Sequence, residues 1–325
     1  MNVYVDKDIA VEGDGSEWDE AKKTLQAGYE VLKDSTDAFN YLYVRSDLTS
    51  PIYNDNLVIN GFFRKVNLFI EPRSYDESTQ IWNTGHFQNK EWDPTKGADT
   101  GDYDPRSMTR PVTLAGSIQI VDSGTVALHG FAITGSVLVN LHALMGGFQY
   151  CHFQNNNASL TVLADSNALI EGCCFTNTVF GVTLNNRAFL IMDHDNYFVD
   201  PVGGAARFLS NSLVHIKQSC ELYTTQPTGK DWYGFKITEH SRLKLWEGAD
   251  EDYSQNDNHV GHLAVINEMP KIMPGYKGIL LESGAMLQGA KRLLFVTQNL
   301  KGEPVPMPIG NTICMKANSN VTVIE

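Results

Sequence analysis

Hydrophobic residues recur along this chain at a nearly fixed interval. Four phenylalanines stand 22, 22 and 23 residues apart, namely Phe131, Phe153, Phe175 and Phe198. A second row keeps the 22-residue step, with Leu138, Leu160 and Val182. Such a period in short strand-like stretches is typical of a chain wound into coils that stack along one axis. One coil cannot bury its apolar residues alone, so we expect the repeat to bring like residues into register on neighbouring coils.

Small polar corners separate these apolar stretches. Ser, Asn and Gly are frequent there, and they suit tight turns because they tolerate left-handed backbone and hydrogen-bond it locally. After each corner, apolar and polar residues alternate, which turns every second side chain inward. Corners with their following strands are expected at 122–128, 165–170, 185–190, 210–216, 240–245, 282–287 and 318–324. Their spacing widens after Ser212, so we expect loops of roughly ten to twenty residues on the later coils.

The first residues follow a different pattern. A short strand is expected at 3–6, and apolar residues then recur at helical spacing at Trp18, Ala21, Leu25, Tyr29 and Leu32. Ser16, with Asp19 three residues later, has the pattern of a helix N-cap. We therefore predict one amphipathic helix over 17–33 that covers the open end of the coil stack.

Two stretches interrupt the coils. Residues 74–110 hold five aromatic residues among seven acidic ones and are too long for a simple turn. Residues 247–262 are acidic with two histidines and form a second interruption, for which a solvated loop is the first interpretation and a metal site the second. The predicted organisation is a strand and capping helix over 1–35 and coils over 36–325, with excursions at about 74–110 and 247–262.

Composition limits the function classes. The 325 residues are 42% hydrophobic and 19% charged, which suits a folded protein with a sizeable core. The net charge of −13 argues against a nucleic-acid-binding surface, which needs a basic footprint. No apolar run of about 18 residues occurs, and the opening is polar and strand-like, so we expect neither membrane insertion nor Sec export.

Five cysteines make neither a CxxC pair nor a disulfide framework. Cys151 and Cys173 stand 22 residues apart, so we expect them to stack on neighbouring coils as small packing residues. A metal site or a disulfide at this stack is the alternative.

The coil pattern resembles the right-handed parallel β-helix of the pectate lyase-like superfamily. The strand at 3–6, the Gly-Asp-Gly turn at 13–15 and the helical pattern from Trp18 are similar to the start of many such chains, phage tailspikes and tail-fibre proteins among them. The resemblance implies an all-β, right-handed, single-stranded parallel β-helix with coils of about 22 residues, an N-terminal capping helix and long loop excursions. It covers roughly 40–325 and specifies function poorly, because this scaffold carries lyases, hydrolases, esterases and structural modules.

Outward-facing positions follow from the alternation. If Val126 and Leu128 point inward, Ala127 and His129 point outward. The equivalent positions on later coils are then Gln149 and Cys151, Glu171 and Cys173, and, after the 23-residue step, Asp193 or His194 and Asp195 or Asn196. Because neighbouring strands lie about 4.7–4.9 Å apart, Glu171 and Asp193 are expected side by side on one face.

Polysaccharide-cleaving β-helices carry acidic residues on an outward face. A neighbouring Glu171 and Asp193 resemble the carboxylate pair of a retaining glycosidase, whose carboxyl groups are about 5–5.5 Å apart. The catalytic candidates are therefore Glu171, Asp193 and Asp195. The alternative is that these are solvated side chains on an exposed strand.

The run Asp193-His194-Asp195 also suits a divalent cation such as calcium, through its carboxylate oxygens. It is faintly similar to the Asp-His strand end near the calcium site of pectate lyases, but no Arg-x-Pro-x-x-Arg segment accompanies it, which argues against that activity. No other cofactor is expected. The extra residue of the 23-residue step predicts a bulge that re-aims Asp193 or His194.

Aromatic residues of the first excursion are the substrate-binding candidates, together with His194. Trp82, Trp92 and Tyr103 can stack on the apolar faces of sugar rings, while neighbouring Asp side chains bond hydroxyl groups. Packing of these rings on the flank of the solenoid, or a subunit contact, are the alternatives.

Two function hypotheses follow. The first is a virion protein, a tailspike, fibre or baseplate appendage, that binds host-surface polysaccharide and other virion proteins and forms a homotrimer, as the resemblance implies. The second is a polysaccharide lyase or glycoside hydrolase that uses the outward carboxylates. A secreted bacterial adhesion protein is a third, with an extracellular location in place of the virion.

Overall fold

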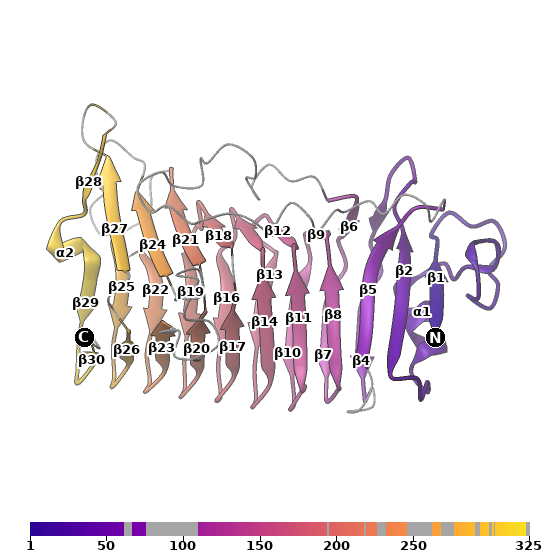
Figure 1. Cartoon of the computed structure of the whole chain (residues 1–325), viewed down its shortest axis with the longest axis horizontal. Helices are drawn as coiled ribbons and strands as arrows, with labels where there is room; N and C mark the ends of the chain where they lie inside the picture. Colours follow the sequence, from indigo (N-terminus) through magenta and orange to yellow (C-terminus); the bar gives the residue numbers. More distant parts are fainter. Residues whose placement is uncertain are drawn as a thin grey trace, which may run out of the picture.

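The chain forms a parallel β-helix. The computed structural model describes residues 1–61, 67–75, 110–193, 195–217, 219–225, 232–245, 262–267, 276–289, 293–298, 301 and 303–322. Short strands return to the same three sheets once per coil, and Figure 1 shows the coils side by side along the long axis, from the N-terminus in indigo to the C-terminus in yellow. The solenoid expected from the repeat is confirmed.

Three sheets make the walls of the solenoid in the described part of the chain. Sheet A contains β1 (Asn2–Val5), β2 (Phe39–Arg45), β5 (Asn67–Arg73), β8 (Thr125–His129), β11 (Met145–Gln149), β14 (Asn167–Glu171), β17 (Phe189–Met192), β20 (Leu213–Ile216), β23 (Arg242–Leu245), β26 (Met286–Gln288) and β30 (Asn320–Thr322). Sheet B contains β3 (Ile52–Tyr53), β6 (Val112–Leu114), β9 (Phe131–Ile133), β12 (His152–Gln154), β15 (Cys174–Thr176), β18 (Asn196–Val199), β21 (Ser219–Thr224), β24 (His262–Asn267), β27 (Leu293–Gln298) and β28 (Pro304–Pro306), the last of which pairs antiparallel. Sheet C contains β4 (Leu57–Asn60), β7 (Ile118–Val121), β10 (Ser136–Asn140), β13 (Ser159–Val162), β16 (Phe180–Leu184), β19 (Gly204–Phe208), β22 (Tyr233–Ile237), β25 (Lys277–Leu281) and β29 (Ile313–Met315).

A continuous apolar core fills the interior. Parallel registers place Phe153 beside Phe175 and Phe175 beside Phe198. Their ring centroids lie 4.5 and 4.8 Å apart in nearly parallel planes, and all three side chains are buried. This ladder confirms that the repeat aligns like residues, because each ring covers the face that its neighbour would otherwise expose.

The fourth phenylalanine lies outside the ladder. Phe131 is buried, but its neighbours Ala132 and Ile133 pair with His152 and Phe153, which puts Phe131 in the row of Cys151. The coil between them is two residues shorter than the spacing of the phenylalanines implies.

The second predicted row is also out of register at its first member. Val137, rather than Leu138, pairs with Leu160, which in turn pairs with Val182. The coil length itself varies: the buried partners Leu128, Phe148, Ile170, Met192, Ile216 and Leu245 of sheet A are 20, 22, 22, 24 and 29 residues apart. The widening expected after Ser212 is present.

The corner between sheets C and A is made by pairs of residues with left-handed backbone. Ala164 and Asp165 have φ of 51° and 58°, and Asn186 and Arg187 have φ of 55° and 62°. Each corner is bonded to the next, since Asp165 N donates to Asn186 O at 3.0 Å and Arg187 N donates to Ser210 O at 2.9 Å. Polar corners therefore form a hydrogen-bonded column along the solenoid, as the abundance of Asn and Ser at these positions suggests.

The N-terminal end is covered by a helix shorter than predicted. The range 17–33 contains a 3₁₀ turn, η1 (Trp18–Glu20), and then α1 (Leu25–Leu32), which packs on β1, β2 and β4. Thr24, not Ser16, is the N-cap, because its hydroxyl accepts from Ala27 N at 3.1 Å. Trp18 packs instead on the outer face of sheet A beside Tyr43, so one apolar period served two different surfaces.

The extra residue of the 23-residue step lies in the turn between β17 and β18, as predicted. Two residues connect Phe148 to Cys151 and Ile170 to Cys173, whereas three connect Met192 to Asn196. Asn196 is buried, accepts from Cys173 N at 3.2 Å and donates to Asp193 O at 2.9 Å. Its amide therefore satisfies backbone groups that the widened turn would leave without partners inside the protein.

Most of both predicted excursions, at 76–109 and 246–261, lies outside the described residues. Where the structure describes the chain, no helix combines the length and apolar character that a membrane span requires.

Candidate functional site

A row of polar side chains runs along the outer face of sheet A, next to its turn into sheet B. Registers across successive strands place Glu71, His129, Gln149 and Glu171 in line, and we call these with Asp193 the polar row. Adjacent members stand on neighbouring strands, about 4.7–4.9 Å apart at the backbone. The row therefore offers successive hydrogen-bonding groups at a regular spacing.

Glu71 and His129 form the most enclosed part of this row. Glu71 Oε1 lies 3.3 Å from His129 Nδ1, and Oε2 lies 3.5 Å from Arg73 Nη2. Burial by itself raises the pKa of Glu71, but the hydrogen bond and charge of His129, helped by Arg73, outweigh it and lower the pKa overall. The Arg73 guanidinium also lies 4.4 Å from the ring centroid of Tyr43. Glu71 is thus held as a carboxylate beneath two cationic partners.

Glu171 is oriented by donors from the preceding coil. Gln149 Nε2 donates to its Oε2 at 2.5 Å, and Tyr150 Oη donates to its Oε1 at 3.1 Å. Tyr150 is itself fixed at the turn, with φ of 55° and its carbonyl accepting from Arg110 Nε at 2.9 Å. The carboxylate is partly exposed and has a defined orientation.

Asp193 follows Glu171 in the row. Its N–H donates to Ile170 O at 2.9 Å, which continues the parallel ladder one residue past β17. Asp195 occupies a left-handed position of the same turn, with φ of 56°. The predicted neighbourhood of Glu171 and Asp193 is therefore present in the backbone register, and both side chains are partly exposed.

Two of the positions predicted to face outward are buried in the core instead. Cys151 and Cys173 are inaccessible to solvent, and their thiols donate to Leu128 O at 3.4 Å and Phe148 O at 3.2 Å. The left-handed residues Tyr150 and Gly172 interrupt the alternation at the turn, so the residue after each of them faces inward. The two cysteines stack on neighbouring coils as free thiols.

An aromatic strip adjoins the polar row on the same face. Its members are Phe39, Tyr41 and Phe69, which stand at alternate, outward positions of β2 and β5. Tyr41 and Phe69 stack at 5.2 Å, and Phe39 and Phe69 at 6.3 Å, with planes within 25°. Phe39 is 57% exposed. Three nearly coplanar rings with exposed area are suited to contact with a flat, apolar surface.

Neither Glu71 nor the aromatic strip was among the residues predicted from sequence. The alternation in Phe39-Asn-Tyr-Leu-Tyr43 marks outward aromatic residues, and that signal could have identified the strip. Nothing local pairs Glu71 with His129, because the first excursion separates the two strands.

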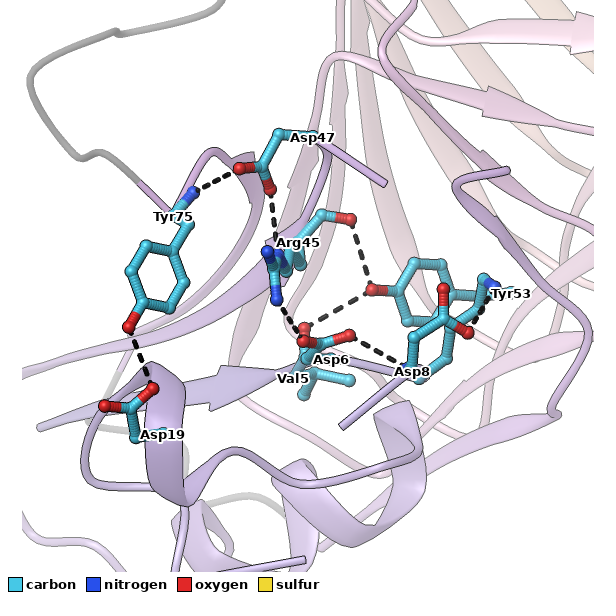
Figure 2. A network of polar contacts seen from close by, with 9 residues as sticks. Val5, Asp6, Asp8, Asp19, Arg45, Asp47, Tyr53 and Tyr75 are labelled. Atoms are coloured by element: carbon cyan, nitrogen blue, oxygen red, sulfur yellow. Dashed lines mark hydrogen bonds and ion pairs between the residues drawn. The ribbon is translucent and has the colours of Figure 1, made fainter. Parts of the chain in front are cut away.

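A polar network fixes the chain where the first excursion leaves sheet A (Figure 2). Arg45 pairs with Asp6 at 2.5 Å and with Asp47 at 2.9 Å. Tyr75 is the last described residue before the excursion; its N–H donates to Asp47 at 3.1 Å and its hydroxyl donates to Asp19 at 2.8 Å. These contacts tie the N-terminal segment to the base of the excursion.

A second polar cluster lies on the outer face of sheet B. His152 bonds Thr176 Oγ1 through Nε2 and Gln154 Nε2 through Nδ1, both at 2.8 Å. Burial, reinforced by the charge of Arg110, lowers the pKa of His152 to about 4, so its ring is neutral at pH 7. Glu221 is also buried and accepts from the Tyr223 hydroxyl. These groups bond one another and suit a structural role.

The remaining sequence candidates, Trp82, Trp92, Tyr103 and His194, lie outside the described residues, as do all but the last residue of 247–262. Among the residues that the structure describes, no three His, Cys, Asp or Glu side chains are grouped so as to hold a metal ion. The calcium hypothesis depends on His194 and its two neighbours and stays a prediction.

Comparison with known proteins assigns no family to this arrangement. A scan against protein-family models finds no match, and searches of curated proteins and of solved structures find no significant match.

Proposed function

We propose that this protein binds polysaccharide along the outer face of sheet A, as a structural and host-recognition component of a phage tail. The observation that carries the proposal is the aromatic strip beside the polar row on one continuous face. Sugar rings present an apolar face and a rim of hydroxyl groups, so they need an aromatic surface and hydrogen-bonding groups close together. The strip and the row supply both, and their rigid sheet costs little ordering on binding.

The virion part of the proposal is supported by the resemblance of the opening segment and coil pattern to tailspike and tail-fibre proteins of the pectate lyase-like superfamily. The same resemblance supports a homotrimer and contacts with other virion proteins. Light scattering of the purified chain should then give three times its 36.1 kDa mass. Mass spectrometry of purified phage particles from the source should detect the chain in the tail. Its absence from particles would favour the extracellular alternative.

The binding test uses a panel of bacterial surface polysaccharides with the full chain. We expect a subset to bind and a Tyr41→Ala, Phe69→Ala double variant to weaken that binding about tenfold or more. Phe180→Ala is the matched control, since Phe180 is a partly exposed aromatic residue on sheet C that contacts Arg207. Equal loss in the control, or no loss in the double variant, would contradict binding on this face.

Cleavage of the bound polysaccharide is the second candidate function. It is favoured by the position of Asp193 directly after Glu171 in the polar row and by the two donors that orient Glu171. Release of reducing ends or unsaturated products from the bound polysaccharide is the assay, with Glu171→Gln and Asp193→Asn as variants. We expect at least a hundredfold loss of turnover with binding retained. Undiminished turnover in the double variant would exclude this pair.

A further inference from the structure

The charge on the outer face of sheet A reverses along the solenoid. Lys217 is the next position of the polar row after Asp193, because its N–H donates to Met192 O at 2.8 Å. Beside it, His215 pairs in register with Lys244, and Leu213 with Arg242. We call His215, Lys217, Arg242 and Lys244 the basic patch. The chain has only 25 Lys and Arg against 38 Asp and Glu, so this grouping on β20 and β23 departs from its average.

The basic patch is a surface feature with mutual proximity. Arg242 is exposed, and Lys217 and Lys244 are partly exposed. Burial lowers the pKa of His215, and the charges of Lys244 and Lys217 lower it further, which places both ammonium groups within electrostatic reach of the ring. In the described ranges, no carboxylate lies within ion-pair distance of Lys217 or Arg242.

We propose that the basic patch binds the acidic group of an anionic polysaccharide whose neighbouring sugars lie on the aromatic strip and polar row. This proposal rests on the proposed function and specifies its ligand class. Lys and Arg side chains bind carboxylate, sulfate or phosphate groups through charge-assisted hydrogen bonds, which are stronger than neutral ones. The partly buried position of Lys217 and Lys244 reduces the screening that weakens exposed ion pairs.

The rest of the face specifies where the acidic group cannot go. Glu71, Glu171 and Asp193 repel an anion over β5 to β17, so the acidic sugar is confined to β20 and β23. The distance from Phe69 on β5 to His215 on β20 is five strand spacings, or about 24 Å. A single polysaccharide chain along the axis can therefore contact the aromatic strip and the basic patch at once, with its direction set by charge.

Nucleic acid is disfavoured as the occupant. A phosphate backbone carries charge at every residue, so most of it would face the acidic polar row, and the chain has a net charge of −13. A polysaccharide with acidic sugars separated by neutral ones matches the observed segregation of charge.

The test compares acidic polysaccharides with their carboxyl-reduced forms, and sulfated with desulfated forms, by isothermal titration calorimetry. The variant is Lys217→Gln combined with Arg242→Gln, and the control is Lys236→Gln on sheet C, which removes one positive charge from another face. We expect the acidic form to bind at least tenfold more tightly than its neutral partner, and the double variant to remove that preference. Raising the salt concentration should weaken only the acidic form.

The outcomes separate this inference from the proposed function. Equal binding of acidic and neutral forms, or a preference kept by the double variant, overturns the anionic ligand and leaves polysaccharide binding intact. Binding of no polysaccharide in the panel overturns both. Equal competition by single-stranded DNA would assign the patch to nucleic acid and also contradict the inference. Retention of the far-ultraviolet circular dichroism spectrum checks that the variants fold.

Discussion

The two ends of the solenoid solve the same problem unequally. At the N-terminal end, α1 lies over β1 and β2, and Val3, Leu25 and Leu42 are buried. At the C-terminal end, the four-residue helix α2 (Ile309–Thr312) lies beside β25 and β29, and Ile313 and Val321 stay partly exposed. A coil is stabilised by neighbours on both sides, so a terminal coil depends on what covers it. We infer that the N-terminal end is the more stable of the two.

Core truncation should give the largest difference between the ends. Leu42→Ala removes a fully buried side chain under α1, for which we expect a loss of about 2–5 kcal/mol in the free energy of unfolding. Ile313→Ala, at a partly exposed position of the other end, should cost about 1 kcal/mol. Urea denaturation of the purified variants measures both. Similar costs at the two positions would break the comparison.

Glycine substitution gives the next largest effect, with opposite signs at the two ends. An added Cβ at Gly28 of α1 would meet Leu42 Cδ1 at 2.6 Å and Val5 Cγ2 at 2.7 Å, so Gly28→Ala should destabilise by about 1–3 kcal/mol despite the better helix propensity of Ala.

Gly310 of α2 is the matched control, because an added Cβ there has no atom within 4 Å. Gly310→Ala should be neutral or stabilise by up to about 1 kcal/mol, as helix propensity predicts. Thermal melts of the two variants distinguish the cases, and stabilisation by Gly28→Ala would mean that α1 packs less closely than described.

The smallest effect concerns pH and again involves the N-terminal half. The pKa of Glu71 is lowered in the folded state, so its contribution to stability is present above its ordinary value of 4.5 and is lost as pH falls through the folded value. We expect the wild type to lose about 1 kcal/mol more than Glu71→Gln between pH 6 and pH 3. Hydrogen exchange at the two pH values should show the loss in β5 and β8 rather than in β29 and β30.

The sequence predicted the fold because its signals are local or strictly periodic. Phe153, Phe175 and Phe198 stack because their coils have similar length, and the same reasoning failed for Phe131 because one short coil shifted its register. The helix prediction failed at Trp18, whose apolar spacing fits both a helix and packing on sheet A. A period identifies repetition without identifying the surface that each apolar residue covers.

The candidate site was predicted only where coils were regular. Glu171 and Asp193 were correctly placed together because a 22-residue step separates them. Glu71 faces His129 across an excursion of variable length, and Lys217 joins the row only through a 24-residue coil. Such partners follow from the three-dimensional register, which no fixed spacing supplies.

The column of left-handed corners has a consequence for how such a protein can be rebuilt. From Leu141 onward, two residues lead from sheet C into each left-handed pair, and the pair is followed by a short, constant step into sheet A. Additions of length fall at the other two turns of the coil. Residues 165–186 therefore form a modular unit that begins and ends at equivalent corner positions. Excising or duplicating that unit should shorten or lengthen the solenoid by one coil while leaving the seam between its neighbours intact.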